Sequence, residues 1–335
     1  MAVTLNIDAL TATTQKLYLK TVVDQVHDRI PLIYRLRKRN NVTSDGGSQI
    51  QVPLRYGKNT QTQNYVKGQI LTSGRDTKLT AAVFDWRHTQ VPIKYDVDDE
   101  IKNSGKQQIV NVIAEEVKSA QEDMMDTLSE NFFGIYEGSA STPGDADPLG
   151  LPAAFYGGSY AYGTASYGGI TRAAIGDWWD GNMDDLTTVG AATTVSFSQW
   201  DFMVETCMKY KARRQDLMAV CGSALYRKWK ALVRSKSNND CDVSGMMAKA
   251  GFESFNIDGV ELVLDDNCPA STFYMLDTAQ WKWHISPKRN FKMTPFKSQA
   301  EYNNGIDEYL ARVFLSHTGL VCEKPRTSYM ATAMA

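Results

Sequence analysis

Two short stretches with the same alternating pattern, IQVPLRY at 50–56 and QVPIKYDV at 90–97, lie on either side of a polar segment. In both stretches apolar side chains occupy every second position, which predicts two half-buried strands. Each stretch contains a proline, Pro53 or Pro92, which has no N–H to donate to a ladder and therefore favours the edge of a sheet. We therefore expect two edge strands that flank an extended loop, residues 57–78.

The extended loop is polar and basic. Its sizeable apolar side chains are Tyr65, Val66, Ile70 and Leu71. Four basic residues and one acid give it a net charge of +3: Lys58, Lys67, Arg75, Lys78 and Asp76. A lone two-stranded arm of this kind is marginal in water. We expect the loop to be stabilised by contacts outside its own domain.

A long helix is predicted soon after the second strand. Between Gly105 and Phe133, apolar residues recur in steps of three and four, which is the spacing of one helical stripe. Such a helix would be about 43 Å long, and Gly134 gives it a natural end. Residues 98–133 carry nine acids and three lysines, a net charge of −6, so we expect an acidic helix.

Composition limits the classes of function. With 335 residues, 43% of them hydrophobic, the chain can build a core of one or two domains. A net charge of −2 predicts no overall attraction to DNA or to an anionic membrane. No apolar run approaches a membrane span, and the first 14 residues lack the pattern of a signal peptide. Five scattered cysteines without a CxxC pair favour reduced thiols in a cytoplasmic setting over disulfides or zinc.

The N-terminal arm, residues 1–48, is expected to end in a helix. The pattern predicts this helix at Thr14–Arg39, with an interruption at Pro31. Its end carries a basic cluster that could contact nucleic acid or a partner on an inner surface: Arg35, Arg37, Lys38 and Arg39. A solvated helix end is an equally good interpretation of these charges.

The second half of the chain predicts a loop-rich segment, then an α/β unit. Residues 138–181 combine glycines with tyrosines and tryptophans, which favours ordered loops held by aromatic packing over a platform for sugars. Ser198 and Asp201 are expected to open a helix. A second helix is expected to present Leu225, Trp229, Leu232 and Val233. Strands are expected at 217–221, 260–264, 272–276 and 280–285, with a closing β-pair at 309–315 and 320–323.

The sequence contains no recognisable catalytic motif. Phosphate-loop, dinucleotide-binding, nucleophile-elbow and metalloprotease patterns are missing. The four histidines are far apart, without acids or cysteines at ligand spacing. Three acid pairs favour structural roles, because neighbouring residues on a strand point to opposite faces and acids are common in turns and at helix starts: Asp98-Asp99, Asp184-Asp185 and Asp265-Asp266. We expect no enzyme activity, no cofactor and no metal.

Four stretches, together with the order of the predicted elements, carry a resemblance to a known family. They are DPLGLP at 147–152, YGGITR at 167–172 followed by Trp178-Trp179, FNIDGV at 255–260 running into VLDD at 263–266, and GLVCEKP at 319–325. The chain resembles a tailed-bacteriophage major capsid protein of the Hong Kong-phage-type fold, over nearly its whole length.

This resemblance implies an α+β fold with four parts. They are an N-terminal arm (1–48), an extended β-loop region (49–97), a peripheral domain with a long spine helix (98–147 and 300–335) and an axial α/β domain (148–299). It implies subunits that assemble as pentamers and hexamers into an icosahedral shell around double-stranded DNA, in a virion assembled in the host cytoplasm. Because the arm starts at Met1, a separate scaffolding protein is expected, together with a portal and non-specific contact with the packaged DNA. No membrane partner is expected.

The resemblance also implies that the extended loop lies across a neighbouring subunit. The opposite charges of the loop and the helix agree with this, because charge complementarity fixes partner and register. The expected contact residues are Lys58, Tyr65, Lys67, Ile70, Leu71, Arg75 and Lys78 on the loop and Glu115, Glu116 and Glu122 on the helix. Two alternatives remain open: an encapsulin, which is a bacterial shell of the same fold, and a glycosidase or lectin using the aromatic and acidic residues between 156 and 185.

Overall fold

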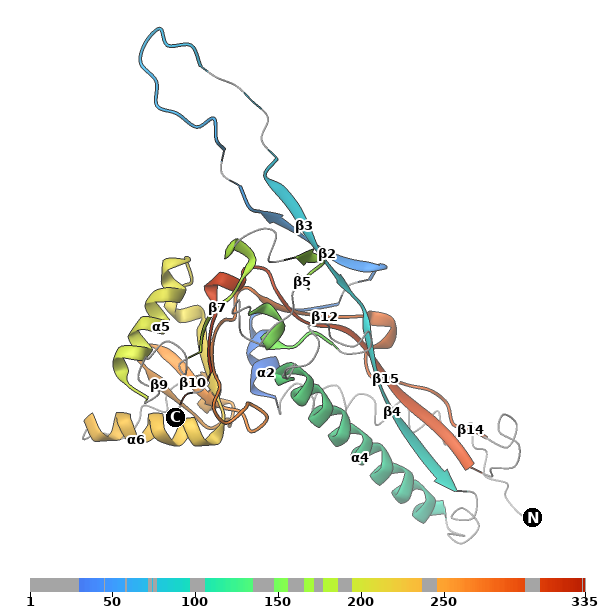
Figure 1. The fold of residues 1–335 in the computed structure, drawn as a ribbon. Coiled ribbons are helices and arrows are strands. Elements are labelled where there is room, and N and C mark those ends of the chain that lie inside the picture. The colour runs from blue at the N-terminus through green and yellow to red at the C-terminus, as the bar shows by residue number, and fades with distance from the viewer. Residues whose placement is uncertain are drawn as a thin grey trace.

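The structure is a computed structural model of residues 1–335. It describes 30–44, 46–57, 59–71, 74, 77–96, 106–134, 148–155, 166–171, 177–185, 195–236, 246–298, 308–332 and 334. Two six-stranded sheets, one long helix and a projecting loop dominate the shape (Figure 1). The α+β class is confirmed, with the long helix and the projecting loop where the sequence predicts them.

The first sheet is organised around one long strand, β15 (Glu308–Cys322). Five strands pair with it directly or through a neighbour: β1 (Val42–Ser44), β4 (Arg87–Asp96), β12 (Trp281–Ile285), β13 (Lys292–Met293) and β14 (Lys297–Ser298). The pair β4–β15 is antiparallel over ten residues, from Asp96 opposite Glu308 to Arg87 opposite His317. Among the strands that the structure describes, β4 pairs with β15 alone, which is the edge position predicted for Pro92.

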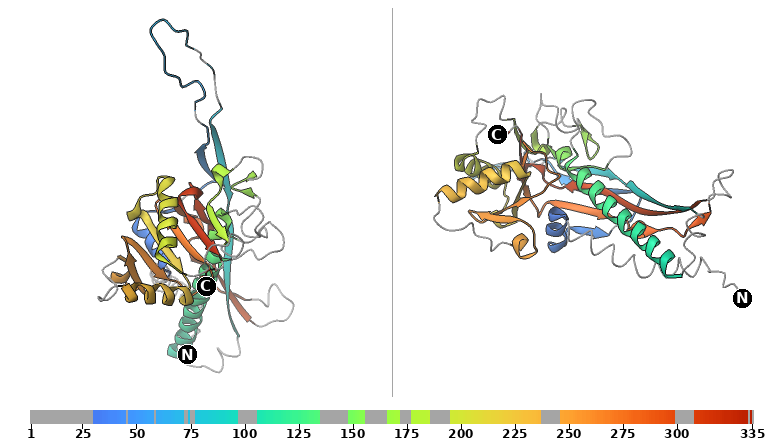
Figure 2. Two further views of the ribbon diagram at one scale, coloured as in Figure 1. Left: turned by 60° about the vertical axis from the view of Figure 1, so that its left-hand side comes forward. Right: turned by 90° about the horizontal axis from the view of Figure 1, so that it is seen from below.

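The second sheet forms an α/β unit with two helices on one face (Figures 1 and 2). Its strand order is β7 (Asn182–Asp185), β16 (Tyr329–Thr332), β11 (Phe273–Asp277), β8 (Leu217–Cys221), β10 (Val260–Leu264) and β9 (Ser254–Ile257). The helices are α5 (Phe197–Lys209) and α6 (Ser223–Lys236). The strands predicted at 217–221 and 260–264 are confirmed to the residue, and those at 272–276 and 280–285 to within one residue.

Alternate side chains of the central strands pack into two separate hydrophobic cores. In β8, Leu217, Ala219 and Cys221 pack with Trp200 of α5 and Trp229 of α6. The intervening Met218 and Val220 pack on the opposite face with the first sheet and the long helix. All five residues of β8 are buried because both faces of this strand are covered.

A separate hairpin carries the extended loop. Its strands are β2 (Gln49–Arg55) and β3 (Leu79–Asp85), which pair antiparallel from Gln49–Asp85 to Arg55–Leu79. Side chains of β2 alternate between exposed and buried, and Ile50, Val52 and Leu54 are the buried ones. The sequence-based expectation that residues 90–97 flank the loop is wrong. Strand β3 is the second flank, and most of 90–97 belongs to β4.

The predicted long helix is confirmed as α4 (Lys106–Phe133), which has 28 residues. Its described inner face includes the predicted stripe, Val117, Ala120, Met124, Leu128 and Phe132, all buried, and Met125 and Phe133 are buried beside it. Figure 1 shows α4 running beside β4 and β15 along the underside of the first sheet. At its end, the ring of Phe132 packs edge-on against Trp283 of β12, with 5.7 Å between ring centroids.

Shorter elements complete the fold. The N-terminal helix α2 (Pro31–Lys38) begins at the predicted interruption, and residues 14–29 of the predicted helix lie outside the described part. The remaining elements are η1 (Leu151–Ala154), β5 (Ser166–Tyr167), β6 (Ile170–Thr171), η3 (Asp177–Trp179), η4 (Arg214–Asp216), α7 (Met246–Lys249), η5 (Pro287–Arg289) and η6 (Pro325–Thr327).

Two further expectations differ from the observed strand pairing. The closing β-pair, 309–315 and 320–323, is one continuous strand, β15, which pairs with β4 and β12. The expected domain boundaries also cross the sheets. Strands β12 to β14 fall within the expected axial part but pair into the first sheet, and β16 falls within the expected peripheral part but pairs with β11. Helix α5 begins one residue before Ser198, and its N-cap is Ser196.

Candidate assembly surfaces

The tip of the extended loop presents apolar side chains to solvent. The exposed fractions are 66% for Tyr65, 75% for Val66, 90% for Ile70 and 53% for Leu71. Two local bonds close the tip: the N–H of Gln69 donates to the Val66 carbonyl at 3.1 Å, and the N–H of Val66 donates to Gln69 Oε1 at 3.2 Å. The loop therefore projects from the body of the chain as a preformed turn (Figure 1).

The basic side chains of the loop are only partly described. Lys67 is exposed at the tip, and Lys78 is half-buried at the root. Lys58 and Arg75 lie outside the described residues, so their predicted contacts stay predictions. The loop carries charged and apolar side chains and contributes nothing to the core. These properties are typical of a surface that binds another molecule.

The acidic face of α4 is wider than the three predicted glutamates. Glu116 is exposed, Glu122 is half-buried, and the side chain of Glu115 lies outside the described residues. Asp123, Asp126 and Glu130 are also exposed. Together with Glu116 they are spaced seven, three and four residues apart, so they form one stripe about 21 Å long on one side of the helix. The sequence already contained this spacing, and we name Glu116, Asp123, Asp126 and Glu130 the acidic stripe.

The basic cluster at the end of α2 is largely used within the chain. Arg35 is 6% exposed and pairs with Glu261 of β10, with 3.5 Å between Nη1 and Oε2. Arg39 pairs with Asp216 at 2.5 Å and donates to the Gln215 carbonyl at 2.8 Å. The pKa of Arg35 is lowered, chiefly by burial and then by the charge of Arg39. These contacts fasten α2 to the second sheet, so Arg35 is not available to nucleic acid.

The other two members of that cluster have different surroundings. Arg37 and Lys38 are exposed, and Lys38 Nζ lies 5.4 Å from the centre of the Tyr34 ring. A contact with nucleic acid or a partner would therefore involve Arg37 and Lys38, and it stays a prediction.

The aromatic segment between 156 and 185 is used for packing where it is described. Tyr167 and Trp179 are 0% and 1% exposed, and Trp179 Nε1 donates to the Tyr167 carbonyl at 3.0 Å. The Tyr167 hydroxyl accepts the Cys322 N–H at 2.8 Å, which connects this segment to β15. The preference for packing over a sugar platform is confirmed for these two residues, while Tyr156, Tyr160 and Tyr162 lie outside the described part.

The described acid pairs have structural partners. Asp184 accepts a hydrogen bond from the Tyr329 hydroxyl on the neighbouring strand. Asp265 is 6% exposed and accepts the Asn267 N–H at 3.1 Å, which is the predicted turn after a strand. Burial raises the pKa of Asp265 to about 6, and the nearby charge of Asp266 adds to the effect. The pair Asp98-Asp99 lies outside the described residues.

The described residues also bear on metal binding and membrane insertion. In this part of the chain, no three His, Cys, Asp or Glu side chains are grouped so that they could hold a metal ion. None of the helices described there is both long and apolar enough to cross a membrane.

Comparison with solved structures identifies the fold. The capsid asymmetric unit of cyanophage A-1(L) superposes with a TM-score of 0.57 at 14% identity, covering 88% of this chain and 90% of that one. The chain has a phage capsid fold. The capsid of the native GTA particle gives a TM-score of 0.54 at 12% identity, covering 90% and 91% of the two chains. The capsid of the empty GTA particle gives 0.53 at 11% identity, covering 89% and 96%. No family model and no curated protein sequence matches the chain.

Proposed function

We propose that this protein is the major capsid protein of a tailed bacteriophage, which assembles as pentamers and hexamers into an icosahedral shell around double-stranded DNA. The observation that carries the proposal is the phage capsid fold over about nine-tenths of the chain. The projecting loop with its exposed apolar tip supports it independently, because exposed apolar patches mark surfaces that bind another molecule.

In this function the protein acts by assembly and not by turnover. The described histidines hydrogen-bond to neighbouring side chains, and Asp184 and Asp265 pair a strand and cap a turn, which supports a structural role for these residues. The protein would reside in the virion after assembly in the host cytoplasm, with a scaffolding protein and a portal as partners and non-specific contact with the packaged DNA. An encapsulin is less favoured, because the similar solved structures are phage and GTA capsids.

The extended loop and the acidic face of α4 would form the main contact between copies. Exposed ion pairs contribute about 0–1 kcal/mol each, while burying an apolar side chain of the size of Ile70 contributes about 1.5–3 kcal/mol. The apolar tip would therefore supply most of the affinity. The charges of the loop and of Glu115, Glu116 and Glu122 would select the partner and its register.

Electron microscopy of the purified protein tests the proposal directly. We expect shells, or capsomers that form shells when a scaffolding protein is supplied. A protein that stays monomeric under every such condition would contradict it. DNA inside shells purified from infected cells would separate a viral capsid from an encapsulin.

Charge reversal of the loop tests the proposed contact. The triple variant Lys58→Glu, Lys67→Glu and Lys78→Glu should keep its circular dichroism spectrum, since the loop is outside the core, but should lose assembly in sedimentation. The variant with arginine at the same three positions is the matched control and should assemble. Lysine at Glu115, Glu116 and Glu122 should restore part of the assembly. Normal shells from the triple variant would show that the charge pattern is incidental.

A further inference from the structure

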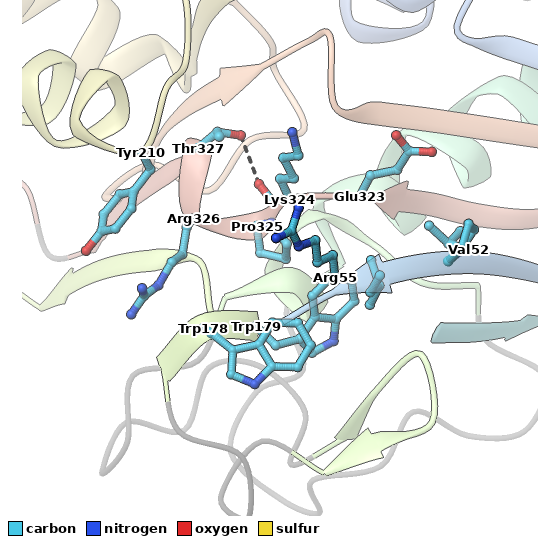
Figure 3. Close-up of a pocket in the computed structure, with 12 residues that line it drawn as sticks. Val52, Arg55, Trp178, Trp179, Tyr210, Glu323, Lys324, Pro325, Arg326 and Thr327 are labelled. Atoms are coloured by element: carbon cyan, nitrogen blue, oxygen red, sulfur yellow. Dashed lines mark hydrogen bonds between the residues drawn. The ribbon is translucent and has the colours of Figure 1, made fainter. Parts of the chain in front are cut away.

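A pocket of about 570 Å³ lies at the root of the extended loop. Its walls come from 52–55 of β2, from Trp178 and Trp179 of η3, from Tyr210 after α5, and from 323–327 around η6 (Figure 3). Trp178 is half-buried and stacks on Tyr56, with 5.6 Å between ring centroids. We name this feature the root pocket.

Three cations at the root pocket have no acidic partner in the part of the chain that the structure describes. They are Arg55 and Lys324, which are exposed, and Arg326, which is half-buried. Arg55 Nε reaches only the Gly57 carbonyl at 3.4 Å, and the Arg326 guanidinium lies 4.9 Å from the centre of the Tyr210 ring. Within the described residues none of the three forms an ion pair. The nearby Glu323 does not compensate them, because Lys282 Nζ already donates to it at 2.6 Å.

The pocket is suited to binding through side chains and not through strand addition. The N–H of Tyr56 donates to the Lys78 carbonyl at 3.1 Å, so alternate residues of β2 face β3. Pro53 therefore lies on the other, unpaired edge, where it offers no N–H to an incoming strand. A ligand must instead match the three positive charges and the apolar surface of the tryptophans. That chemistry fits a short acidic peptide with an apolar side chain.

The chain itself contains such a peptide. Residues 96–100 read DVDDE, with four carboxylates and one valine. In the chain this segment runs from the last residue of β4 toward the start of α4. Figure 1 shows both of these at the end of the molecule opposite to the loop root. The ten residues of β4 span about 30 Å, so the end of β4, where the segment begins, lies far from the loop root of the same chain.

We propose that the root pocket of one copy binds residues 96–100 of a second copy. The carboxylates pair with Arg55, Lys324 and Arg326, and Val97 lies against the tryptophan wall. The contact joins two different surfaces of identical chains, so it is head-to-tail and can be repeated around a ring. This inference rests on the proposed function, since it assigns one contact within the proposed shell.

Two other ligands fit the charge of the root pocket less well. The acidic stripe of α4 also has unpaired carboxylates, but a straight helix about 10 Å wide does not enter a pocket of this volume. Nucleic acid would follow a track of cations, whereas the cations here are gathered around a single pocket. Both ligands are therefore included in the tests as competing outcomes.

Peptide binding tests the pocket without requiring shells. A fluorescent peptide covering 94–102, KYDVDDEIK, should bind the dissociated protein at low salt in an anisotropy titration. Binding should weaken at least about ten-fold, or 1.4 kcal/mol, for the pocket variant Arg55→Glu, Lys324→Glu and Arg326→Glu. The surface variant Lys228→Glu, Lys288→Glu and Lys292→Glu changes charge equally away from the pocket and should bind normally. If glutamate at these positions disturbs folding, glutamine replaces it.

Three results of the titration would overturn the proposal. The first is no binding by the parent protein. The second is equal binding of a neutralised peptide that carries the changes Asp98→Asn, Asp99→Asn and Glu100→Gln. The third is stronger binding of a short oligonucleotide than of the peptide.

Assembly tests the same contact between copies. The pocket variant and the segment variant Asp98→Lys, Asp99→Lys and Glu100→Lys should each assemble poorly, and the chain that combines them should regain assembly. Rescue by lysines at Asp123, Asp126 and Glu130 instead would reassign the pocket to the acidic stripe and overturn the proposal. A parent protein that binds the peptide but never forms shells would refute the proposed function while leaving the pocket assignment in place.

Discussion

Acid should weaken the first sheet through His317, which is fully buried in β15. Its Nδ1 accepts two hydrogen bonds, from Trp283 Nε1 at 3.3 Å and from the Gly319 N–H at 3.1 Å. Both partners can only donate, so Nδ1 carries no proton and Nε2–H faces Thr89 Oγ1 at 3.3 Å. A second proton would have to bind Nδ1, and it would break both of these hydrogen bonds because neither partner can accept. Burial, together with the nearby His88, lowers the pKa of His317 to about 4.

The size of the effect follows from linkage. An unfolded histidine has a pKa near 6.5 and the folded one about 4, so the unfolded chain takes up a proton first as the pH falls. The contribution of His317 is fully present above pH 6.5 and is lost as the pH falls toward 4. Between pH 7.5 and pH 5 this amounts to about 2 kcal/mol of unfolding free energy.

Urea unfolding of the dissociated subunit at pH 7.5 and pH 5 measures this loss. Asp265 acts in the opposite direction, because its raised pKa makes the folded state take up a proton first as the pH falls. This proton uptake raises the free energy of unfolding by about 1.4 kcal/mol between pH 7.5 and pH 5. The informative quantity is therefore the difference between variants. His317→Gln should remove about 2 kcal/mol of acid destabilisation relative to the parent, whereas His88→Gln, at an exposed position, should keep most of it. An identical pH dependence in His317→Gln and the parent would refute the assignment.

Two further predictions concern buried or constrained positions. Asp265→Asn should raise the free energy of unfolding at pH 7.5 by up to about 3 kcal/mol, and by about half as much at pH 5, because the amide keeps the Asn267 contact without a buried charge. Unchanged stability at both pH values would contradict it. Gly319→Ala should cost more than about 2 kcal/mol in urea unfolding, because Gly319 has φ +77° and a Cβ there would lie 2.4 Å from backbone atoms of Leu149. The control Gly169→Ala, at φ +72° in open space, should cost about 1 kcal/mol, and equal losses would show that the close approach to Leu149 does not matter.

The spacing of apolar residues predicts an element correctly where that element can be recognised from its own residues alone. The stripe from Val117 to Phe132 predicted α4, and an unbroken apolar run predicted β8. The acidic stripe was equally accessible from the spacing of its four residues. The buried face of a helix determines which residues remain outside, so the exposed stripe follows once the inner stripe is known.

The pairing between strands that are distant in the sequence could not be predicted from local patterns. The partner of β4 lies more than 200 residues along the chain, and no local pattern specifies that register. Gly319 lies between the two predicted closing strands, which form one continuous strand, β15. Its positive φ allows the chain to pass against Leu149 without leaving the sheet. Strand β3 was missed because its alanines gave a weak alternation, although Ala82 and Phe84 are buried.

The small net charge of −2 results from the cancellation of large local charges. The extended loop carries +3 and the segment 98–133 carries −6, and the root pocket adds three cations that the described chain does not neutralise. A monomer gains nothing from keeping such charges apart, because pairing them within one chain would stabilise it. Their separation favours contacts between copies, in which a basic surface of one chain meets an acidic surface of the next. The same separation opposes contacts between like surfaces, so the charge pattern supports ordered rings over random aggregation.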